Sequence, residues 1–318
     1  MTAPVAKVHV AATIVRARMM RRWSWTRVAS FGFTVPAVFF LATMMGLFLW
    51  QSLPVWRHAG WDYIIGEQWH YRQREFGALA MIYGTFIVSV AALLLAGPIG
   101  IGAALFTAEI LPPGWRLTVK GAIELLAGVP SVVYGLLGIL FLREWIYHAL
   151  QPFEPLSGDT LLTAGVLLAV MILPTVTTLS DDALRGVPIG QRLAARALGL
   201  TRAEAVFAIA LPQARRGVFA ALLLGIGRAL GETIAVFLVV GRRDNVLPET
   251  PWSLRPLIEA GQTLTSKLGG SETNIAYGDP LHWAAMAGLG LILLAIAGAV
   301  TCLAARLMRG KEAHAPLG

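Results

Sequence analysis

Six long apolar runs constrain the fold of this chain more than any other feature of its sequence. A helix needs about 20 predominantly apolar residues to cross a bilayer, and each of these runs is long enough. Only 14% of the 318 residues are charged, whereas a soluble globular protein carries roughly 25%. The expected spans are Val28–Trp50, Ala78–Thr107, Thr118–Leu142, Thr160–Ser180, Gly217–Val240 and Leu281–Ala305.

The runs indicate membrane-spanning helices rather than barrel strands. Within lipid every backbone polar group needs an internal partner, which only helices and closed barrels provide. The runs are continuous and lack the short alternating pattern of barrel strands. We therefore expect an all-α polytopic membrane protein with six transmembrane helices and no separate soluble domain. Residues 1–27 would form a basic cytoplasmic segment, residues 28–305 the membrane domain, and residues 306–318 a cytoplasmic tail.

Several features that would point to other classes of protein are missing from the sequence. The first run is longer than the core of a cleaved signal peptide, and Pro54–Arg57 follow where small residues would lie. The sole cysteine, Cys302, lies in the last run and excludes an intramolecular disulfide. The histidines are scattered without a metal-ligand spacing. We expect neither a metal nor another cofactor.

The lysines and arginines are distributed unequally between the loops, which predicts the orientation of the chain. Of the 26 basic residues, 17 lie in the N-terminal segment, the loops after the second and fourth runs, and the C-terminal tail. Eight lie in the alternate loops, and Arg228 lies within a run. Both termini are therefore predicted to be cytoplasmic. Basic loops facing anionic membrane lipids account for the net charge of +8, so no nucleic acid is expected as a partner.

Two polar loops are long enough to carry structure of their own. Residues 181–216 form a basic cytoplasmic loop, and residues 241–280 form the longest extracytoplasmic loop. Within the second loop, the amphipathic stretch Leu254–Leu268 predicts a helix that lies along the outer membrane surface, although a plain connector fits equally well. The sequence has no clear internal repeat, which weakens a secondary-transporter fold built from two related halves.

The cytoplasmic loop predicts a helical hairpin. Its first helix covers about Ile189–Leu198, and Gly199 can supply the left-handed residue that ends it. Thr201 then begins the second helix, with Glu204 three residues later in the pattern of a capping box. Pro212 is expected to close the second helix.

One side of the first helix is suited to docking a partner. Ala194, Ala195 and Leu198 are expected to share that side, and small side chains there would let the helix seat deeply in a groove. Arg192 and Arg196 are four residues apart and could pair with acidic groups of the partner. An ordinary surface hairpin at the lipid headgroups explains the same pattern.

Arg228 lies about a dozen residues inside the fifth run, where a charge is costly. A charged side chain at the centre of a bilayer costs about 2.5–3.5 kcal/mol on insertion scales. Glu232 lies four residues on, so we expect the two side chains to pair on one helix face. A static pair that only neutralises itself is one interpretation. Intramembrane charges more often line a pathway, and we favour that function.

The pair suggests a mechanism for moving an anion. A guanidinium offers hydrogen-bond donors that match an oxyanion such as phosphate. Glu232 would hold Arg228 when no substrate is present, and the substrate would compete for the arginine during passage. Thr233 and Ser131 are candidate pathway hydroxyls, although bonding to a carbonyl one turn back is the commoner role of such groups. Glu124, near the cytoplasmic start of the third run, is a second candidate for a buried acid, although at that depth its side chain can also reach the membrane interface.

The hairpin resembles the cytoplasmic loop shared by permease subunits of ABC-type importers. That loop commonly reads E-A-A, three residues, G, nine residues, and I-x-L-P. Leu193 stands where that family usually has the glutamate, which affects one polar contact to the ATPase and leaves the spacing unchanged. The matching positions of this chain are Ala194, Ala195, Gly199, Ile209, Leu211 and Pro212.

Other stretches resemble phosphate-specific permeases of the PstC type. Leu125–Gly138 is similar to their third-span signature, and Gly225–Val236 is similar to their fifth-span signature. Met171–Pro174 and Gly97–Gly100 also lie where that family has comparable runs. The resemblance covers roughly Ala78–Ala305, which is most of the chain.

The resemblance implies the type I ABC importer permease fold and a role in ATP-driven phosphate import across a bacterial inner membrane. This chain would form half of the pathway, together with a PstA-like second permease, two copies of an ATPase and an extracytoplasmic phosphate-binding protein. The chain has no Walker A pattern, so ATP hydrolysis is expected in a separate subunit and this subunit is not expected to be an enzyme. The alternatives are a permease for molybdate or sulfate, an ion-gradient-driven secondary transporter, and a membrane scaffold that senses phosphate.

Overall fold

The computed structural model describes residues 3–248, 253 and 255–309, with side chains from residue 28 onward apart from Pro113 and Arg309. Within these residues, six helical segments are long and apolar enough to cross a membrane, as the sequence predicts. Contacts divide the chain into two compact units, residues 1–51 and residues 52–318. The candidate spans are Val28–Ala59, Leu79–Ile110, Ser131–Phe153, Leu161–Arg185, Arg202–Leu230 and Pro280–Met308.

The first unit consists of the N-terminal part of helix α1, which runs over Ala3–Ala59. From Val28 to Trp50 its side chains are almost all exposed, including Phe31, Phe33 and Phe39. An isolated helix with such a continuous apolar surface is stable only in an apolar environment, because water would solvate it poorly. This part of the chain is therefore suited to contact with lipid.

The second unit is a bundle built around α3 (Leu79–Leu105), α7 (Leu161–Arg185), α10 (Leu211–Leu230) and α15 (Pro280–Arg309). Glycines let α3 and α10 approach α7. A Cβ atom placed on Gly100 or Gly225 would lie 2.8 or 2.9 Å from a methyl group of the buried Val176. Membrane helices lack a hydrophobic drive to associate, so close packing at small residues of this kind holds them together.

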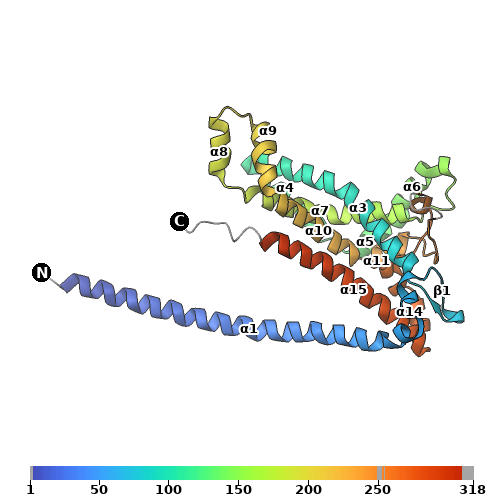
Figure 1. Cartoon of the computed structure of the whole chain (residues 1–318). Coiled ribbons are helices and arrows are strands. Elements are labelled where there is room, and N and C mark those ends of the chain that lie inside the picture. The colour runs from blue at the N-terminus through green and yellow to red at the C-terminus, as the bar shows by residue number, and fades with distance from the viewer. Residues whose placement is uncertain (1–2, 249–252, 254, 310–318) are drawn as a thin grey trace. The chain divides into compact units, whose positions relative to one another are not determined.

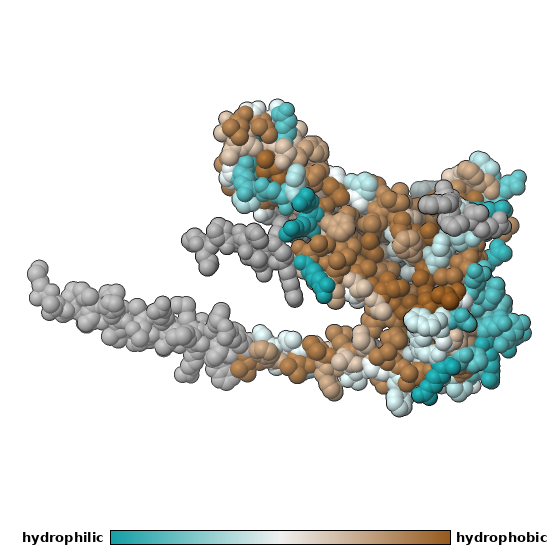
Figure 2. Space-filling model, viewed as in Figure 1, coloured by the Kyte–Doolittle hydropathy of each residue, from teal (hydrophilic) through white to brown (hydrophobic). Residues whose placement is uncertain are grey.

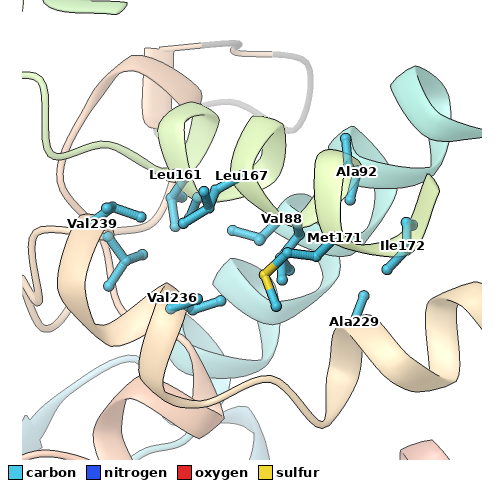
Figure 3. Close-up of a cluster of buried hydrophobic side chains, with 14 of the residues drawn as sticks. Val88, Ala92, Leu161, Leu167, Met171, Ile172, Ala229, Val236 and Val239 are labelled. Atoms are coloured by element: carbon cyan, nitrogen blue, oxygen red, sulfur yellow. The ribbon is translucent and has the colours of Figure 1, made fainter. Parts of the chain in front are cut away.

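An apolar cluster lies between the helices of this bundle, as Figure 3 shows. Side chains of α3, α7, α10 and the short helix α11 (Ile234–Val239) meet there, and each labelled residue is at most 5% exposed. The labelled members are Val88, Ala92, Leu161, Leu167, Met171, Ile172, Ala229, Val236 and Val239.

The remaining elements are short. They are α2 (Asp62–Ile65), the paired strands β1 (Trp69–His70) and β2 (Glu75–Phe76), η1 (Tyr71–Gln73), η2 (Phe106–Ile110), α4 (Pro113–Ala127), α5 (Ser131–Leu137), η3 (Gly138–Leu142), α6 (Arg143–Leu150), η4 (Gln151–Phe153), α8 (Ile189–Ala197), α9 (Arg202–Ala205), η5 (Val206–Ala210), α12 (Arg255–Ile258), α13 (Leu264–Leu268) and α14 (Glu272–Ala276).

Polar elements cap the two ends of the second unit. The hairpin α8–α9 lies at one end of α3, α7 and α10, and β1 and α14 lie at the other end (Figure 1). Figure 2 shows apolar residues in brown over the middle of the bundle and polar residues in teal around β1. This distribution fits a membrane domain, because the middle of the bundle would face lipid and both ends would face water.

The predicted third span, Thr118–Leu142, is wrong as a continuous helix. Helix α4 ends at Ala127, and α5 begins at Ser131 after a break at Gly128–Pro130. Pro130 has no N–H and disfavours a helical conformation in the preceding residue, which explains the break. The candidate span in this region is therefore shifted to Ser131–Phe153.

The predicted fifth span, Gly217–Val240, is also interrupted. Helix α10 ends at Leu230, and α11 begins at Ile234, with Gly231–Thr233 between them. Glycine has little helix propensity, so packing against neighbouring elements decides whether the helix continues at Gly231. Here α11 instead packs against α5 and η3.

The predicted surface helix at Leu254–Leu268 is not formed; Leu254 itself lies outside the described residues. The segment contains the short helices α12 and α13, and Gln262–Lys267 are buried. A Cβ atom on Gly84 of α3 would lie 2.1 Å from the carbonyl oxygen of Gln262. This loop therefore packs into the end of the bundle instead of lying along the membrane surface.

Candidate functional site

The two interrupted spans place their breaks close to each other. Helix α5 packs against α11, and a Cβ atom on Gly135 would lie 2.6 Å from Cδ1 of Leu238. Arg228, near the end of α10, donates from Nη2 to the carbonyl oxygen of Ala127 at 3.2 Å. Ala127 is the last residue of α4, so this bond joins the margins of the two breaks. Non-helical backbone at membrane depth is tolerated where it lines a cavity or is buried in protein.

Arg228 is held by neutral acceptors rather than by a carboxylate. Its Nη1 donates to Oγ1 of Thr175 on α7 at 3.1 Å, and its side chain is exposed in the single subunit. Within the described part of the chain it forms no ion pair, so the predicted pair with Glu232 is wrong. The helix ends at Leu230, and Glu232 no longer lies one turn further along the same helix face.

The other predicted pathway residues lie in or beside the breaks. Glu232 Oε1 accepts a hydrogen bond from the backbone N–H of Ala235 at 3.3 Å, at the start of α11. The hydroxyl of Thr233 lies 3.5 Å from the carbonyl oxygen of Gly231. Ser131 is the first residue of α5, and its hydroxyl makes no hydrogen bond within the described residues. The further candidate Glu124 is exposed on α4, so it is not a buried acid.

The predicted hairpin is present, and its turn is formed as the sequence indicates. Helix α8 covers Ile189–Ala197, and Gly199 has a φ of +90°, in the left-handed region. The N–H of Leu200 bonds to the carbonyl of Ala195 at 3.2 Å, and the N–H of Gly199 bonds to that of Arg196 at 3.0 Å. These two bonds form a Schellman motif, which satisfies the free carbonyls of the helix end.

The capping box at the start of α9 is also confirmed. The N–H of Thr201 donates to Glu204 Oε2 at 2.7 Å, and the N–H of Glu204 donates to Thr201 Oγ1 at 3.3 Å. Together the motif and the cap fix the direction in which the chain leaves α8 and enters α9.

The faces of α8 differ from the prediction. Ala195 is 4% exposed and packs inward, whereas Ala194 and Leu198 are exposed, so the three do not form one docking face. The large apolar side chains exposed on this helix are Ile189 and Leu193, at 74% and 56%. Leu193 therefore lies on the open surface, where a glutamate would offer a polar group and this chain offers an apolar one.

Arg192 is already paired with an acidic residue of this chain, contrary to the prediction that it would pair with a partner protein. Its Nη1 forms an ion pair with Glu109 in η2, and its Nη2 donates to the carbonyl oxygen of Leu184. Both charged side chains are mostly buried. The hairpin is thereby fastened to the end of α3 and to α7. Arg196 is exposed and remains open to an external partner.

Pro212 does not close the second helix of the hairpin. The chain stays helical through α9, the π-helical turn η5 and α10, and Pro212 is the second residue of α10. Proline has no backbone N–H, so it is tolerated in the first turn of a helix. The π-helical turn η5 directly before α10 interrupts the regular α-helical hydrogen bonds, so the missing N–H of Pro212 does not break the helix. Ile209 and Leu211 are half-buried, and Leu211 packs on an apolar cluster beside α7.

A buried ionic cluster at the opposite end of the bundle has no local sequence signal. Lys267 is 1% exposed and pairs with Asp244 at 2.7 Å and with Glu272. Glu272 also accepts from Trp69 Nε1 at 2.6 Å and contacts His282 Nε2 at 2.9 Å. Burial acts to raise the pKa of Glu272, but the bonds from Lys267, Trp69 and His282 outweigh it and lower the pKa. The members of this ionic cluster come from five separate segments of the chain, so only folding brings them together.

Comparisons with known proteins agree with this architecture. Residues 96–310 match the family model for the binding-protein-dependent transport system inner membrane component. The chain is 34% identical over 263 residues to the phosphate transport system permease protein PstC of Mesorhizobium japonicum, covering 78% of this chain and 77% of that relative. It is 36% identical to the PstC 1 protein of Mycobacterium tuberculosis, covering 70% of this chain and 69% of that relative.

Solved structures show the same fold. The fold is similar to a chain of a bacterial alginate ABC transporter, with a TM-score of 0.54 and 15% identity, over 94% of this chain and 96% of that one. The six spans, the hairpin and these relatives lead to one assignment. This chain is a multi-pass membrane permease subunit that belongs to the binding-protein-dependent transport system inner membrane component family and, within it, to the PstC group.

Proposed function

We propose that this chain is the permease subunit of an ATP-driven phosphate importer and forms half of its translocation pathway. The observation that carries this proposal is the placement of Arg228 between two helix breaks, in a chain whose relatives are phosphate transport permeases. An arginine held only by neutral oxygens keeps its full charge, and its donors can be transferred to a stronger acceptor. A passing phosphate is such an acceptor.

The pathway residues would act in sequence on the anion. Phosphate would displace Thr175 Oγ1 and the carbonyl of Ala127 from Arg228, because charge-assisted hydrogen bonds are roughly twice as strong as neutral ones. The hydroxyls of Ser131 and Thr233 would supply further donors. Glu232 would repel the anion after it binds, so that the site stays weak and the anion is released.

Movement of the hairpin would switch the access of this site. As an ABC importer permease, the chain works with a separate ATPase and a substrate-binding protein. We propose that the ATPase is present in two copies, that it docks on the exposed Ala194 and Leu198, and that a PstA-like permease supplies the other half of the pathway. The binding protein would deliver phosphate at the opposite end. Differential affinity in the two states would select the direction.

The orientation in the membrane is part of the same proposal. The hairpin and the loop 241–280 lie at opposite ends of the bundle, which supports a cytoplasmic hairpin and an external loop (Figure 1). With six spans, both termini would then be cytoplasmic, in the inner membrane of a bacterium.

Uptake of radioactive phosphate by the assembled importer tests this function. Bacterial cells that lack their own phosphate importers would express this chain with its partner permease, ATPase and binding protein. We expect saturable uptake that an excess of unlabelled phosphate suppresses and that sulfate or molybdate leaves unchanged. Suppression by sulfate or molybdate would assign the chain to another oxyanion. Uptake by this chain without the ATPase would make it a secondary transporter.

A further inference from the structure

A pocket of about 230 Å³ lies at the hairpin end of the bundle, apart from the helix breaks. The hairpin forms one side, and η2 and α4 form the other. Four arginines line it together with one carboxylate. These charged side chains are Arg116, Arg192, Arg196, Arg202 and Glu109.

The positive charge of this pocket is not balanced by the protein. Glu109 is the one acid that lines it, and it pairs with Arg192. Arg116 donates from Nε to the carbonyl oxygen of Leu111 at 2.7 Å, which leaves its charge uncompensated. Arg196 and Arg202 form neither an ion pair nor a side-chain hydrogen bond within the part of the chain that the structure describes.

The other nearby acids are engaged elsewhere. Glu204 caps α9 through Thr201. Asp181 pairs with Arg185 at 2.7 Å, and Asp182 pairs with Lys120 at 2.9 Å. No rearrangement of these side chains neutralises the pocket without breaking an existing bond. Like charges that converge on a small space repel one another unless an anion lies between them.

Arg192 has one side-chain donor that no described residue accepts from. Its two terminal nitrogens are bonded to Glu109 and to the carbonyl of Leu184, but its Nε is buried without any hydrogen-bond partner. Leaving a buried charged donor unsatisfied is costly, and such groups in native structures usually mark an absent water or ion. The Arg192 guanidinium therefore has hydrogen-bonding capacity that the described residues do not use.

We propose that this pocket binds a phosphate oxyanion from the cytoplasmic side. Guanidinium groups present paired donors that match the oxygens of such an anion. The inference rests on the proposed function, because imported phosphate is the oxyanion that accumulates on that side. A bound anion would bridge α8 to η2 and α4, strengthen the fastening that Arg192 and Glu109 provide, and restrain the hairpin. Imported phosphate would thereby slow its own import.

Equilibrium binding of radioactive phosphate tests the site directly. The importer would be purified with its ATPase in phosphatidylcholine nanodiscs, without ATP or binding protein, and with Arg228→Gln to remove the pathway arginine. We expect saturable binding that the double variant Arg196→Gln/Arg202→Gln weakens about tenfold or more. The matched control Arg215→Gln/Arg216→Gln removes two exposed arginines that do not line the pocket and is expected to bind normally.

Three different results of this binding experiment would overturn the proposed phosphate site. Absence of saturable binding, or equal binding by the pocket variant and its parent, overturns the site. Loss of phosphate binding when the nanodiscs contain phosphatidylglycerol would show that a lipid headgroup occupies the pocket, which overturns the assignment to free phosphate. Loss of the ATPase from the pocket variant alone would show that these arginines pair with carboxylates of that subunit, which also overturns the proposal.

Initial uptake rates separate this inference from the proposed function. Proteoliposomes with ATP inside would be loaded with either phosphate or chloride. We expect internal phosphate to slow uptake several-fold in the parent importer and to have little effect in Arg196→Gln/Arg202→Gln. Equal inhibition of both would overturn the regulatory role. An importer that binds phosphate in this pocket but never accumulates it would disprove the transport function and leave the site intact.

Discussion

The guanidinium of Arg228 donates a hydrogen bond to Oγ1 of Thr175 at 3.1 Å, and this bond joins the fifth span to the fourth beside two helix breaks. Both acceptors of Arg228, Thr175 Oγ1 and the carbonyl oxygen of Ala127, are neutral, and neither Glu232 nor any other described carboxylate forms an ion pair with the arginine. The charge is therefore available to an anion, at the cost of the two neutral bonds that hold the side chain in place.

Replacement of Arg228 by Gln is expected to reduce phosphate uptake by tenfold to a hundredfold. The substitution removes charge-assisted hydrogen bonds, each of which is worth roughly 1.5–3 kcal/mol. The variant should assemble with its ATPase normally, because Arg228 lies near the C-terminal end of α10, whereas the hairpin precedes its N-terminal end. Arg216→Gln, on the same helix, serves as the control. Normal uptake by the Arg228 variant would remove it from the pathway.

Thr175→Val is expected to lower uptake several-fold with little change in stability. Valine keeps the shape of threonine but leaves Arg228 Nη1 without its acceptor, so the guanidinium would sample other positions. Thr178→Val is the matched control, since that hydroxyl bonds to the carbonyl of Pro174 within its own helix at 2.9 Å. If both variants transport equally well, Thr175 does not position the arginine.

Gly199→Val is expected to uncouple ATP hydrolysis from transport. Gly199 has a φ of +90°, where a side chain costs about 1–2 kcal/mol and a β-branched one costs more. The Schellman turn would distort and move α8 relative to α9. Gly190→Ala is the control, because it has open space and no left-handed backbone. Copurification of the ATPase and phosphate-stimulated hydrolysis are the measurements, and normal values in the valine variant would contradict the role of the turn.

Lys267→Met is expected to destabilise the protein by about 3 kcal/mol, because it leaves the mostly buried carboxylate of Glu272 and the partly buried carboxylate of Asp244 without their cation. Thermal unfolding of the purified protein measures the effect. The double variant Lys267→Met/Glu272→Gln should recover part of the loss by removing one of the two charges. An unchanged unfolding temperature for Lys267→Met would show that the cluster contributes little to stability.

The same cluster predicts a response to acid. The pKa of Glu272 in the folded protein lies below its usual value of 4.5, so its contribution to stability is complete above that pH. It is then lost as the pH falls through the lowered pKa, where the folded protein takes up the proton. The variant Glu272→Gln should therefore lose less stability than the parent between neutral and acidic pH. An identical pH profile for both proteins would exclude this linkage.

Cysteine labelling is expected to place His58 and Arg196 on opposite sides of the membrane. The native thiol of Cys302 is free and exposed, so the experiment needs a Cys302→Ser background. In whole cells, a reagent that does not cross the membrane should label His58→Cys, whereas Arg196→Cys should react only after the cells are opened. Labelling of both from outside would overturn the proposed orientation.

Part of this architecture follows from local patterns. The apolar runs are long enough to determine the spans whatever their neighbours are, so six helical spans could be predicted. Gly199 and the Thr201–Glu204 cap act within a few residues, and both formed as predicted because their hydrogen bonds depend only on nearby backbone. The hairpin motif also identified the family correctly.

Other features depend on contacts between distant residues, and they differed from the prediction. Sequence spacing placed Glu232 beside Arg228 only if the fifth span continued as one helix. Packing of α11 against α5 accompanies the break at Gly231, and the arginine instead bonds to Thr175 and Ala127. The ion pairs of Arg192 with Glu109 and of Lys267 with Asp244 likewise join segments that have no mutual signal in the sequence. The sequence by itself determined which stretches enter the membrane, because transfer into lipid depends on composition over one helix length. Only the tertiary structure decided which charges meet, because that depends on where helices break and which side chains they bring within a few ångströms.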